Sequence, residues 1–270
     1  VLGCLCWMAF HSGIPLASFD EPYSTVLYDR SGELLGATIA LDGQWRFPQQ
    51  SDVPEKFQIA IETFEDKRFR FHPGVDLIAL SRALWSNITS GKIVSGASTL
   101  TMQVIRLARK GQPRTYKEKL IEAIMALRLE ARYSKDDVLA LYAANAPFGG
   151  NVVGLEAAAW RYFQQHPDNL SWAETATLAV LPNSPGLIHP GRNRRELLRK
   201  RNSLLMQLEY EGLLDPTTGR LARQEPLPRR PYPMPQLAPH LLSQMERGSA
   251  TLSTIDRGLQ ILSTDVLLRH

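Results

Sequence analysis

Residues 65–74 read EDKRFRFHPG, and residues 96–103 read GASTLTMQ. Neither run has the apolar pattern of a buried core segment. The first places two carboxylates, a histidine and three basic side chains in ten consecutive positions. The second is a turn of small residues that opens into a helix, which is the usual form of an anion-binding site. The two stretches therefore predict a site for an anionic substrate on a helical framework.

The composition is that of a globular protein. Hydrophobic residues make up 44% and charged residues 21% of the 270 residues, enough for one sizeable domain and an appendage. The net charge of +4 suits an anionic partner, such as a phospholipid surface or a pyrophosphate substrate. No nucleic-acid-binding motif is present, and we expect no nucleic acid partner. Cys4 and Cys6 cannot build a disulfide framework, and no Cys/His cluster has metal-binding spacing.

Residues 1–10 form the apolar run VLGCLCWMAF. It is too short to span a bilayer, which takes about 20 residues. We expect residues 1–20 to hold the outer end of a membrane anchor, with a truncated signal-peptide core as the alternative. Both interpretations place the rest of the chain outside the cytoplasm.

The apolar pattern changes from strand-like to helical at Pro54. Before it, three short runs rich in strand-forming residues predict a small β-hairpin region over residues 21–52. After it, apolar residues recur with the period of a helix, and capping residues precede several segments. Ser134 with Asp137 and Ser171 with Glu174 have the spacing of a capping box. The sequence therefore predicts a mainly α protein with a helical domain over residues 53–222. The expected helices lie at about residues 54–64, 75–90, 98–110, 115–133, 135–145, 152–164, 172–181 and 193–212.

A Pro-rich segment follows the helical domain. Six prolines between residues 226 and 239 predict an extended linker over residues 223–248. Beyond the linker, residues 250–256 are predicted to form a strand and residues 258–268 a helix.

The run at residues 65–74 has the form E-D-x-x-F-x-x-H-x-G. It resembles motif one of the peptidoglycan glycosyltransferase domain, glycosyltransferase family 51, of class A penicillin-binding proteins. Its fixed residues are all present, namely Glu65, Asp66, Phe69, His72 and Gly74. The run at residues 96–103 resembles motif two of the same family. With the later motifs, the resemblance covers about residues 24–210.

The resemblance implies a lysozyme-like helical glycosyltransferase domain that polymerises lipid II into glycan strands. The reaction would invert the donor carbon and release undecaprenyl pyrophosphate. Glu65 would be the general base, because the carboxyl end of the preceding helix disfavours a negative charge and so favours uptake of a proton. The supporting residues would be Asp66, Phe69, His72 and Gly74, with Lys135 from a later motif. Among them, His72 is expected to be a structural hydrogen-bonding residue that holds the loop.

The second motif implies the residues that bind the pyrophosphate. Ser98 or Thr99 caps the helix that follows and exposes backbone N–H groups toward a phosphate. Gln103 and Arg106 share a helix face with Thr99, so that a hydroxyl, an amide and a guanidinium stack in one line. The family has a lysine where Arg106 stands. The positive charge is therefore kept, but a compact ammonium group is replaced by a planar guanidinium with several N–H donors in a fixed geometry.

Residues 118–122, EKLIE, resemble motif three, R-K-x-x-E. Lys119 is expected to bind the pyrophosphate, and Glu122 is expected to be the second essential carboxylate. Glu118 replaces the arginine of the motif, and we expect Lys117 to supply the lost charge. A plain i, i+3 salt bridge between Lys119 and Glu122 is the alternative.

Motif four, K-x-x-I-L-E-x-Y-L-N, is present in weakened form from Lys135, with Ala140 and Ala144 in place of its Glu and Asn. The run PFGG at residues 147–150 is similar to the penicillin-binding protein 1C branch of the family. Residues 249–270 resemble the opening of the transpeptidase module, for which too little chain follows. Penicillin binding is therefore not expected of these 270 residues.

The resemblance also implies partners and a location. The partners would be lipid II, the growing glycan strand, the membrane and proteins of a cell-wall synthesis complex. The catalytic domain would lie on the periplasmic side of the bacterial inner membrane, on a single-pass anchor. No cofactor is required with certainty, and Mg²⁺ or Mn²⁺ would assist the leaving pyrophosphate. No metal ligands are assigned, because the sequence contains no dedicated carboxylate cage.

Two other functions stay open. A muramidase or lytic transglycosylase would share the helical fold and a similar glutamate. The basic residues between positions 106 and 119 argue against it, because a neutral glycan needs no pyrophosphate site. A catalytically weak, lipid II-binding scaffold is suggested by Glu118, Ala140 and Ala144, whereas the retained Glu65 and Glu122 count against it.

Overall fold

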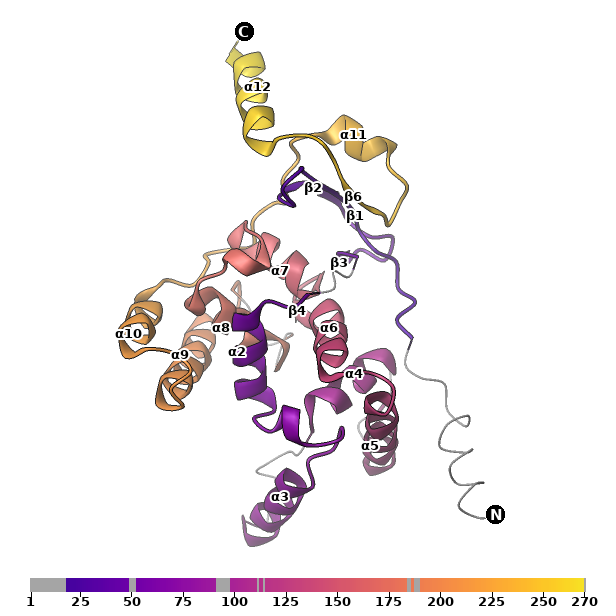
Figure 1. Ribbon diagram of the computed structural model, residues 1–270, viewed down its shortest axis with the longest axis vertical. Coiled ribbons are helices and arrows are strands. Elements are labelled where there is room, and N and C mark those ends of the chain that lie inside the picture. The colour runs from indigo at the N-terminus through magenta and orange to yellow at the C-terminus, as the bar shows by residue number, and fades with distance from the viewer. Residues whose placement is uncertain are drawn as a thin grey trace. The chain divides into compact units, whose positions relative to one another are not determined.

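The computed structural model describes residues 18–48, 52–90, 98–110, 112–113, 115–183, 186 and 190–269. The predicted membrane-anchor segment at residues 1–10 lies outside this part of the chain. The described residues are mainly helical, as the sequence predicts, and Figure 1 shows their helices and short strands. The chain divides into two compact units, one containing Glu62–Tyr142 and the other containing Glu21–Ile61 with Ala143–His270.

The first unit is helical. Its α4 packs against α5, and each of these helices begins at a threonine cap. The hydroxyl oxygen of Thr99 accepts from Met102 N, and that of Thr115 accepts from Glu118 N, which satisfies N–H groups that have no partner inside the helix. The elements are the end of α2 (Glu55–Glu65), the 3₁₀ turn η1 (Phe69–Phe71), α3 (Leu77–Ser90), α4 (Leu100–Ala108), α5 (Tyr116–Glu130) and most of α6 (Lys135–Asn145).

The second unit contains two small sheets. In one sheet, β1 (Thr25–Tyr28) lies between β2 (Leu34–Thr38), which runs antiparallel to it, and β6 (Ala250–Leu252), which runs parallel to it. The other sheet has the order β3 (Trp45–Arg46), β5 (Val152–Val153) and β4 (Pro147–Gly149). The predicted hairpin is therefore present, and a strand from the far end of the chain extends it.

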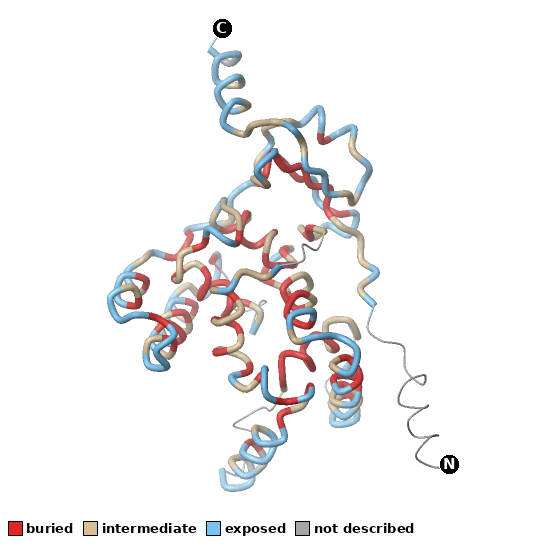
Figure 2. The backbone as a smooth tube through the Cα atoms, viewed as in Figure 1, coloured by how far each residue is buried: buried red, intermediate tan, exposed pale blue. Residues whose placement is uncertain are grey.

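Three helices of the second unit, α7, α9 and α10, pack against α8. Its Ser171 and Glu174 form the reciprocal capping box that the sequence predicts, and α8 packs against α9. Figure 2 shows buried residues along β1 and β2 and along stretches of α7, α8 and α9. The elements are α7 (Leu155–Phe163), η2 (Pro167–Asn169), α8 (Trp172–Val180), η3 (Leu181–Asn183), α9 (Arg194–Tyr210), α10 (Pro216–Gln224), α11 (Pro239–Gln244) and α12 (Arg257–Arg269).

The structure corrects three expectations from the sequence. The segment expected to be an extended linker, residues 223–248, contains the helix α11, which begins at Pro239. The helix expected at residues 152–164 begins only at Leu155, because Val152 and Val153 pair with Trp45 and Arg46 in a sheet. A short helix that the sequence analysis did not predict, α10, follows Asp215, whose carboxylate accepts from two N–H groups of its first turn. Pro216 at its first position suits a helix start, since proline lacks only an N–H that would be unpaired there.

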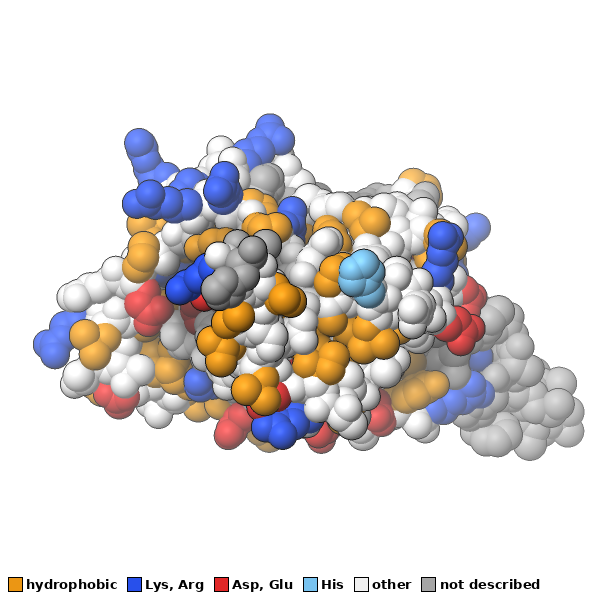
Figure 3. Space-filling view, turned by 90° about the horizontal axis from the view of Figure 1, so that it is seen from above, with side chains coloured by type: hydrophobic (Ala, Val, Ile, Leu, Met, Phe, Trp, Pro, Cys, Tyr) orange, Lys and Arg blue, Asp and Glu red, His pale blue; other side chains and the backbone are white. Residues whose placement is uncertain are grey.

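The C-terminal helix α12 exposes apolar side chains, among them Leu259, Leu262 and Leu267. The face of the molecule in Figure 3 likewise carries hydrophobic side chains together with groups of Lys and Arg. None of the helices within the described ranges has both the length and the apolar character needed to cross a bilayer.

A buried carboxyl group in the second unit makes stability depend on pH. Tyr28 of β1 donates a hydrogen bond of 2.5 Å to Glu156 of α7. Burial raises the pKa of Glu156 from 4.5 to about 7, although the hydrogen bond from Tyr28 acts in the opposite direction. The folded protein therefore keeps this proton at a pH where the unfolded chain has lost it. The associated stability is present below pH 4.5 and is lost as the pH rises toward about 7.

Glu156→Gln is expected to stabilise the protein at pH 8, because glutamine removes a carboxylate that is ionised unfavourably in the buried site. The gain is at most about 3 kcal/mol, since one unit of pKa shift corresponds to about 1.4 kcal/mol. Near pH 5 the variant and the parent should unfold alike. Urea unfolding at both pH values measures this, with Glu211→Gln, an exposed position, as the control. An equal effect of Glu156→Gln at both pH values would contradict the prediction.

Candidate active site

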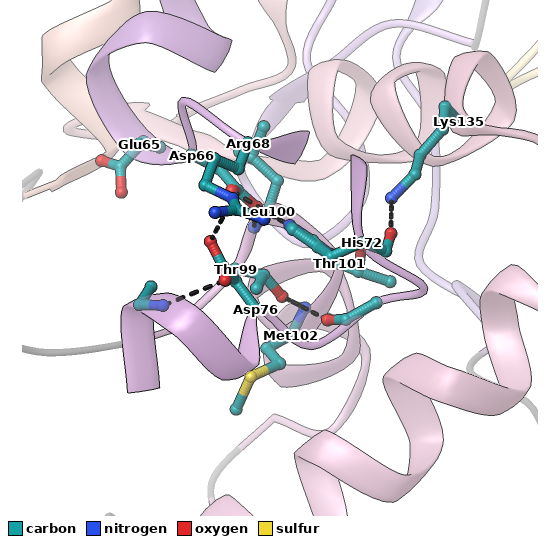
Figure 4. A network of polar contacts seen from close by, with 12 residues as sticks. Glu65, Asp66, Arg68, His72, Asp76, Thr99, Leu100, Thr101, Met102 and Lys135 are labelled. Atoms are coloured by element: carbon teal, nitrogen blue, oxygen red, sulfur yellow. Dashed lines mark hydrogen bonds and ion pairs between the residues drawn. The ribbon is translucent and has the colours of Figure 1, made fainter. Parts of the chain in front are cut away.

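Asp66 is the centre of a buried network that holds the first motif (Figure 4). His72 Nε2 lies 3.1 Å from both carboxylate oxygens of Asp66 and donates to them, because a carboxylate only accepts. Leu100 N, at the start of α4, donates to the same carboxylate at 3.0 Å. One side chain thus joins the end of α2, the His72 turn and the beginning of α4.

Lys135 of α6, which belongs to motif four, bonds to the loop that contains His72. Its Nζ donates to the backbone oxygen of His72 at 2.6 Å and forms an ion pair of 2.6 Å with Glu130. It also lies 4.3 Å from the centre of the Phe69 ring, a cation–π contact with a fully buried side chain. The structure therefore brings together all five residues that the sequence analysis assigned to support.

Gly74 and Thr99 form a second connection between the first two motifs. Thr99 Oγ1 donates to the backbone oxygen of Gly74 at 2.6 Å and accepts from Met102 N at 3.1 Å. Thr99 is 2% exposed. The sequence analysis expected this hydroxyl to lie in line with Gln103 and Arg106 toward a pyrophosphate. In the structure this hydroxyl caps α4, as the sequence predicts, but it donates its proton to the backbone oxygen of Gly74, which the sequence does not predict.

Glu65 is the last residue of α2 and lies at the edge of the network in Figure 4. Gln103 Nε2 donates to Glu65 Oε2 at 2.8 Å, which fixes the orientation of the carboxylate. Tyr142 of α6 is buried nearby, and its hydroxyl has no hydrogen-bond partner among the described residues. Burial raises the pKa of Tyr142, and the negative charge of Glu65 raises it further, whereas Arg106 lowers it. Glu65, Tyr142 and Arg106 thus share one electrostatic environment.

A cavity of about 800 Å³ opens between the end of α4 and the start of α5. Of the residues predicted to bind substrate, Ser98, Arg106 and Lys119 line it, and Glu122 lines it as well. Thr99, Gln103 and Glu65 are not part of its described lining. The described lining residues are Ser98, Arg106, Arg109, Gln112, Pro113, Thr115, Tyr116, Glu118, Lys119 and Glu122.

Arg109 is a cavity residue that the sequence analysis did not assign. Its Nε donates to Glu118 Oε1 at 2.6 Å. The hydrogen bond from Arg109 is the main cause that lowers the pKa of Glu118. The described lining contains Arg109 and not Lys117, although the charge of Lys117 also lowers the pKa of Glu118. The expectation that Lys117 supplies the charge lost with the motif-three arginine stays a prediction. The sequence signal was a pair of opposite charges, but a separation of nine positions along the chain conceals the contact.

Parts of the predicted site lie outside the described residues, among them Gly96 and Ala97 of motif two. Within the described ranges, no group of three or more His, Cys, Asp or Glu side chains is arranged to hold a metal ion. The expectation of Mg²⁺ or Mn²⁺ stays a prediction.

The mainly helical fold, with a cavity lined by cations and carboxylates, agrees with the class that the motifs imply, a helical glycosyltransferase domain. Residues 32–209 match the family described as Transglycosylase. The chain therefore belongs to this family, the glycosyltransferase family 51 that its motifs resemble.

The chain is similar in sequence to penicillin-binding proteins. The chain is 38% identical over 251 residues to penicillin-binding protein 1C of Escherichia coli (strain K12), covering 91% of the chain and 32% of that protein. It is 35% identical over 213 residues to penicillin-binding protein 1A of Aquifex aeolicus (strain VF5), covering 78% and 29%. The crystal structure of penicillin-binding protein 1A from Haemophilus influenzae matches 86% of the chain and 24% of its own length, with a TM-score of 0.43 and 18% identity. The chain thus spans about a third or less of these relatives' length.

Proposed function

We propose that this chain is a peptidoglycan glycosyltransferase that polymerises lipid II into glycan strands. One arrangement of residues carries the proposal. Glu65, at the end of α2, is oriented by the side-chain amide of Gln103. The same unit contains a cavity whose wall includes Arg106, Lys119 and Glu122. An anionic leaving group explains why such a cavity contains Arg106 and Lys119. The family membership of the chain supports the same reaction.

In the proposed reaction, Glu65 takes the proton from the 4-hydroxyl of the acceptor GlcNAc. The oxygen attacks C1 of the donor MurNAc as the bond from C1 to the pyrophosphate oxygen breaks. The bonding electron pair leaves with undecaprenyl pyrophosphate, and the configuration at C1 is inverted. Arg106, Lys119 and the Ser98 hydroxyl stabilise the charge that develops on the leaving group, which is usually a large catalytic contribution.

The buried Glu122 shares the cavity wall with Lys119. In the proposal it orients the acceptor or stabilises the oxocarbenium-like carbon. Mg²⁺ or Mn²⁺ would add charge neutralisation at the pyrophosphate. The described side chains include no metal-binding cluster, so no step is assigned to a metal ion.

We further propose that the enzyme works on the periplasmic side of the bacterial inner membrane, where lipid II and the growing strand are its partners. Proteins of a cell-wall synthesis complex are proposed as further partners. The family membership and the penicillin-binding relatives support this setting.

Fluorescent lipid II in detergent tests the proposal. We expect the 270-residue chain to produce a ladder of glycan polymers on a gel, with and without Mg²⁺, and moenomycin to abolish it. Binding of lipid II without a ladder would contradict the polymerase and support a scaffold, the alternative that Ala140 and Ala144 suggest. Release of soluble fragments from preformed glycan would instead indicate a cleaving enzyme.

A further inference from the structure

Arg109 presents a guanidinium at the cavity wall that the proposed reaction does not use. Arg109 caps the carboxyl end of α4, where its own N–H donates to Ile105 O at 3.0 Å. Its side chain is 25% exposed, so it is partly desolvated and still open to a ligand. A cation in such a setting interacts with an anion more strongly than one on the open surface.

Glu118 accepts a hydrogen bond from one N–H group of this guanidinium. The bond from Arg109 Nε to Glu118 Oε1 is 2.6 Å long, and Arg109 Nη1 makes a weak contact of 3.8 Å with Met125 Sδ. Within the described part of the chain, these contacts use two of the five N–H groups that a guanidinium carries. Donor capacity therefore remains for a second, anionic partner.

The charges on the cavity wall favour such a partner. Three cations, Arg106, Arg109 and Lys119, line the cavity with two carboxylates, Glu118 and Glu122. The hydrogen bond to Glu118 raises the pKa of Arg109, and the negative charges of Glu118 and Glu122 raise it further. The carboxylates thus keep the guanidinium at the wall while the cations remain in excess.

We propose that Arg109 is a further phosphate-binding residue of this cavity and that Glu118 positions it. Glu118 stands where the motif of the family has an arginine, so the guanidinium lost from α5 is supplied from the end of α4 across an ion pair. The identity of the anion, the pyrophosphate of the leaving group, rests on the proposed function. The binding of a phosphate anion by Arg109 does not.

The competing explanation is a plain ion pair that joins α4 to α5. The two explanations differ in symmetry. Removing either partner breaks a structural bridge equally, whereas only Arg109 would touch an anion. Glu118→Gln keeps a carbonyl oxygen that can accept from Arg109 Nε, so the guanidinium stays in position while the wall loses a negative charge.

Titration calorimetry with inorganic pyrophosphate distinguishes them in the 270-residue chain. Arg109→Gln is expected to weaken binding about tenfold or more, the size of a lost charge-assisted hydrogen bond. Glu118→Gln is expected to leave binding unchanged or to tighten it. In turnover of lipid II, Arg109→Gln should lower kcat/KM by a similar factor, and Arg109→Lys should recover part of the loss. The matched control is Arg199→Gln, which breaks an exposed Arg–Glu pair outside the cavity.

Equal losses in Arg109→Gln and Glu118→Gln, both in binding and in the midpoint of thermal unfolding, would overturn the proposal in favour of a structural bridge. Unchanged kcat/KM in a folded Arg109→Gln protein would overturn it while leaving the proposed function intact. Conversely, Arg109-dependent binding of pyrophosphate by a chain that does not polymerise lipid II would support the anion site and contradict the glycosyltransferase.

Discussion

Glu65→Gln is expected to abolish the polymerisation of lipid II and to leave the fold intact. The amide cannot take a proton from the acceptor hydroxyl, and a lost general base lowers the rate by roughly 10²–10⁴-fold. Glutamine keeps the size of the side chain, and its carbonyl oxygen can still accept from Gln103. The loss should therefore appear in kcat rather than in stability. The rate of strand formation from fluorescent lipid II, compared with the thermal unfolding midpoint, measures both.

Glu55→Gln is the matched control for this variant. It makes the same substitution in the same helix, α2, at an exposed position of the first turn. The activity of this control should stay close to that of the parent. Residual polymerisation by Glu65→Gln above about one per cent of the parent rate would contradict its assignment as the general base.

Gly74→Ala is expected to destabilise the first unit severely. Gly74 has a φ of +94°, a conformation that side chains strongly disfavour. An added Cβ would lie 2.6 Å from the backbone oxygen of Ala126 in α5, closer than two such atoms can approach. Because this neighbour is backbone, either the loop or the helix must move. We expect the free energy of unfolding to fall by about 3 kcal/mol or more, above the cost of an unfavourable backbone angle alone.

Gly43→Ala separates the cost of the unfavourable backbone angle from the cost of the steric overlap with α5. Gly43 has a φ of +76°, but an added Cβ would meet nothing within 4 Å. Its loss of stability in urea unfolding should reflect the backbone angle alone, about 1 kcal/mol. The excess loss in Gly74→Ala then measures the overlap with α5. Similar losses in the two variants would show that the close approach to Ala126 is relieved without cost.

Local sequence patterns predict the helices well where the helix ends are set by neighbouring residues. The helix expected at residues 135–145 coincides with α6, since Ser134 and Asp137 exchange hydrogen bonds at its start. The strand pairing of Val152 and Val153 was not predictable in the same way. Their partners, Trp45 and Arg46, lie more than a hundred residues earlier, and a periodic pattern carries no information about such a pair.

The same distinction applies to the site. The sequence predicts that His72 is a structural hydrogen-bonding residue, and the structure shows it bonded to Asp66, only six residues away. The sequence does not reveal that the Thr99 hydroxyl donates to the Gly74 carbonyl, because this bond joins two motifs that are 25 positions apart. Arg109 is a basic residue among several in the sequence, and only its bond to Glu118 places it at the cavity wall.

The parallel pairing of β1 with β6 affects the order in which the second unit forms. Val26 lies opposite Ala250, and Gly248 N donates to Thr25 Oγ1 across 223 positions of sequence. During synthesis, β1 and β2 leave the ribosome long before β6 has been made. The edge of β1 that later pairs with β6 therefore stays exposed until most of the chain has been added. A shortened protein that ends after α10 would keep that open side permanently. Its hairpin would then be a site for pairing with other chains, even where the helices and the cavity are intact.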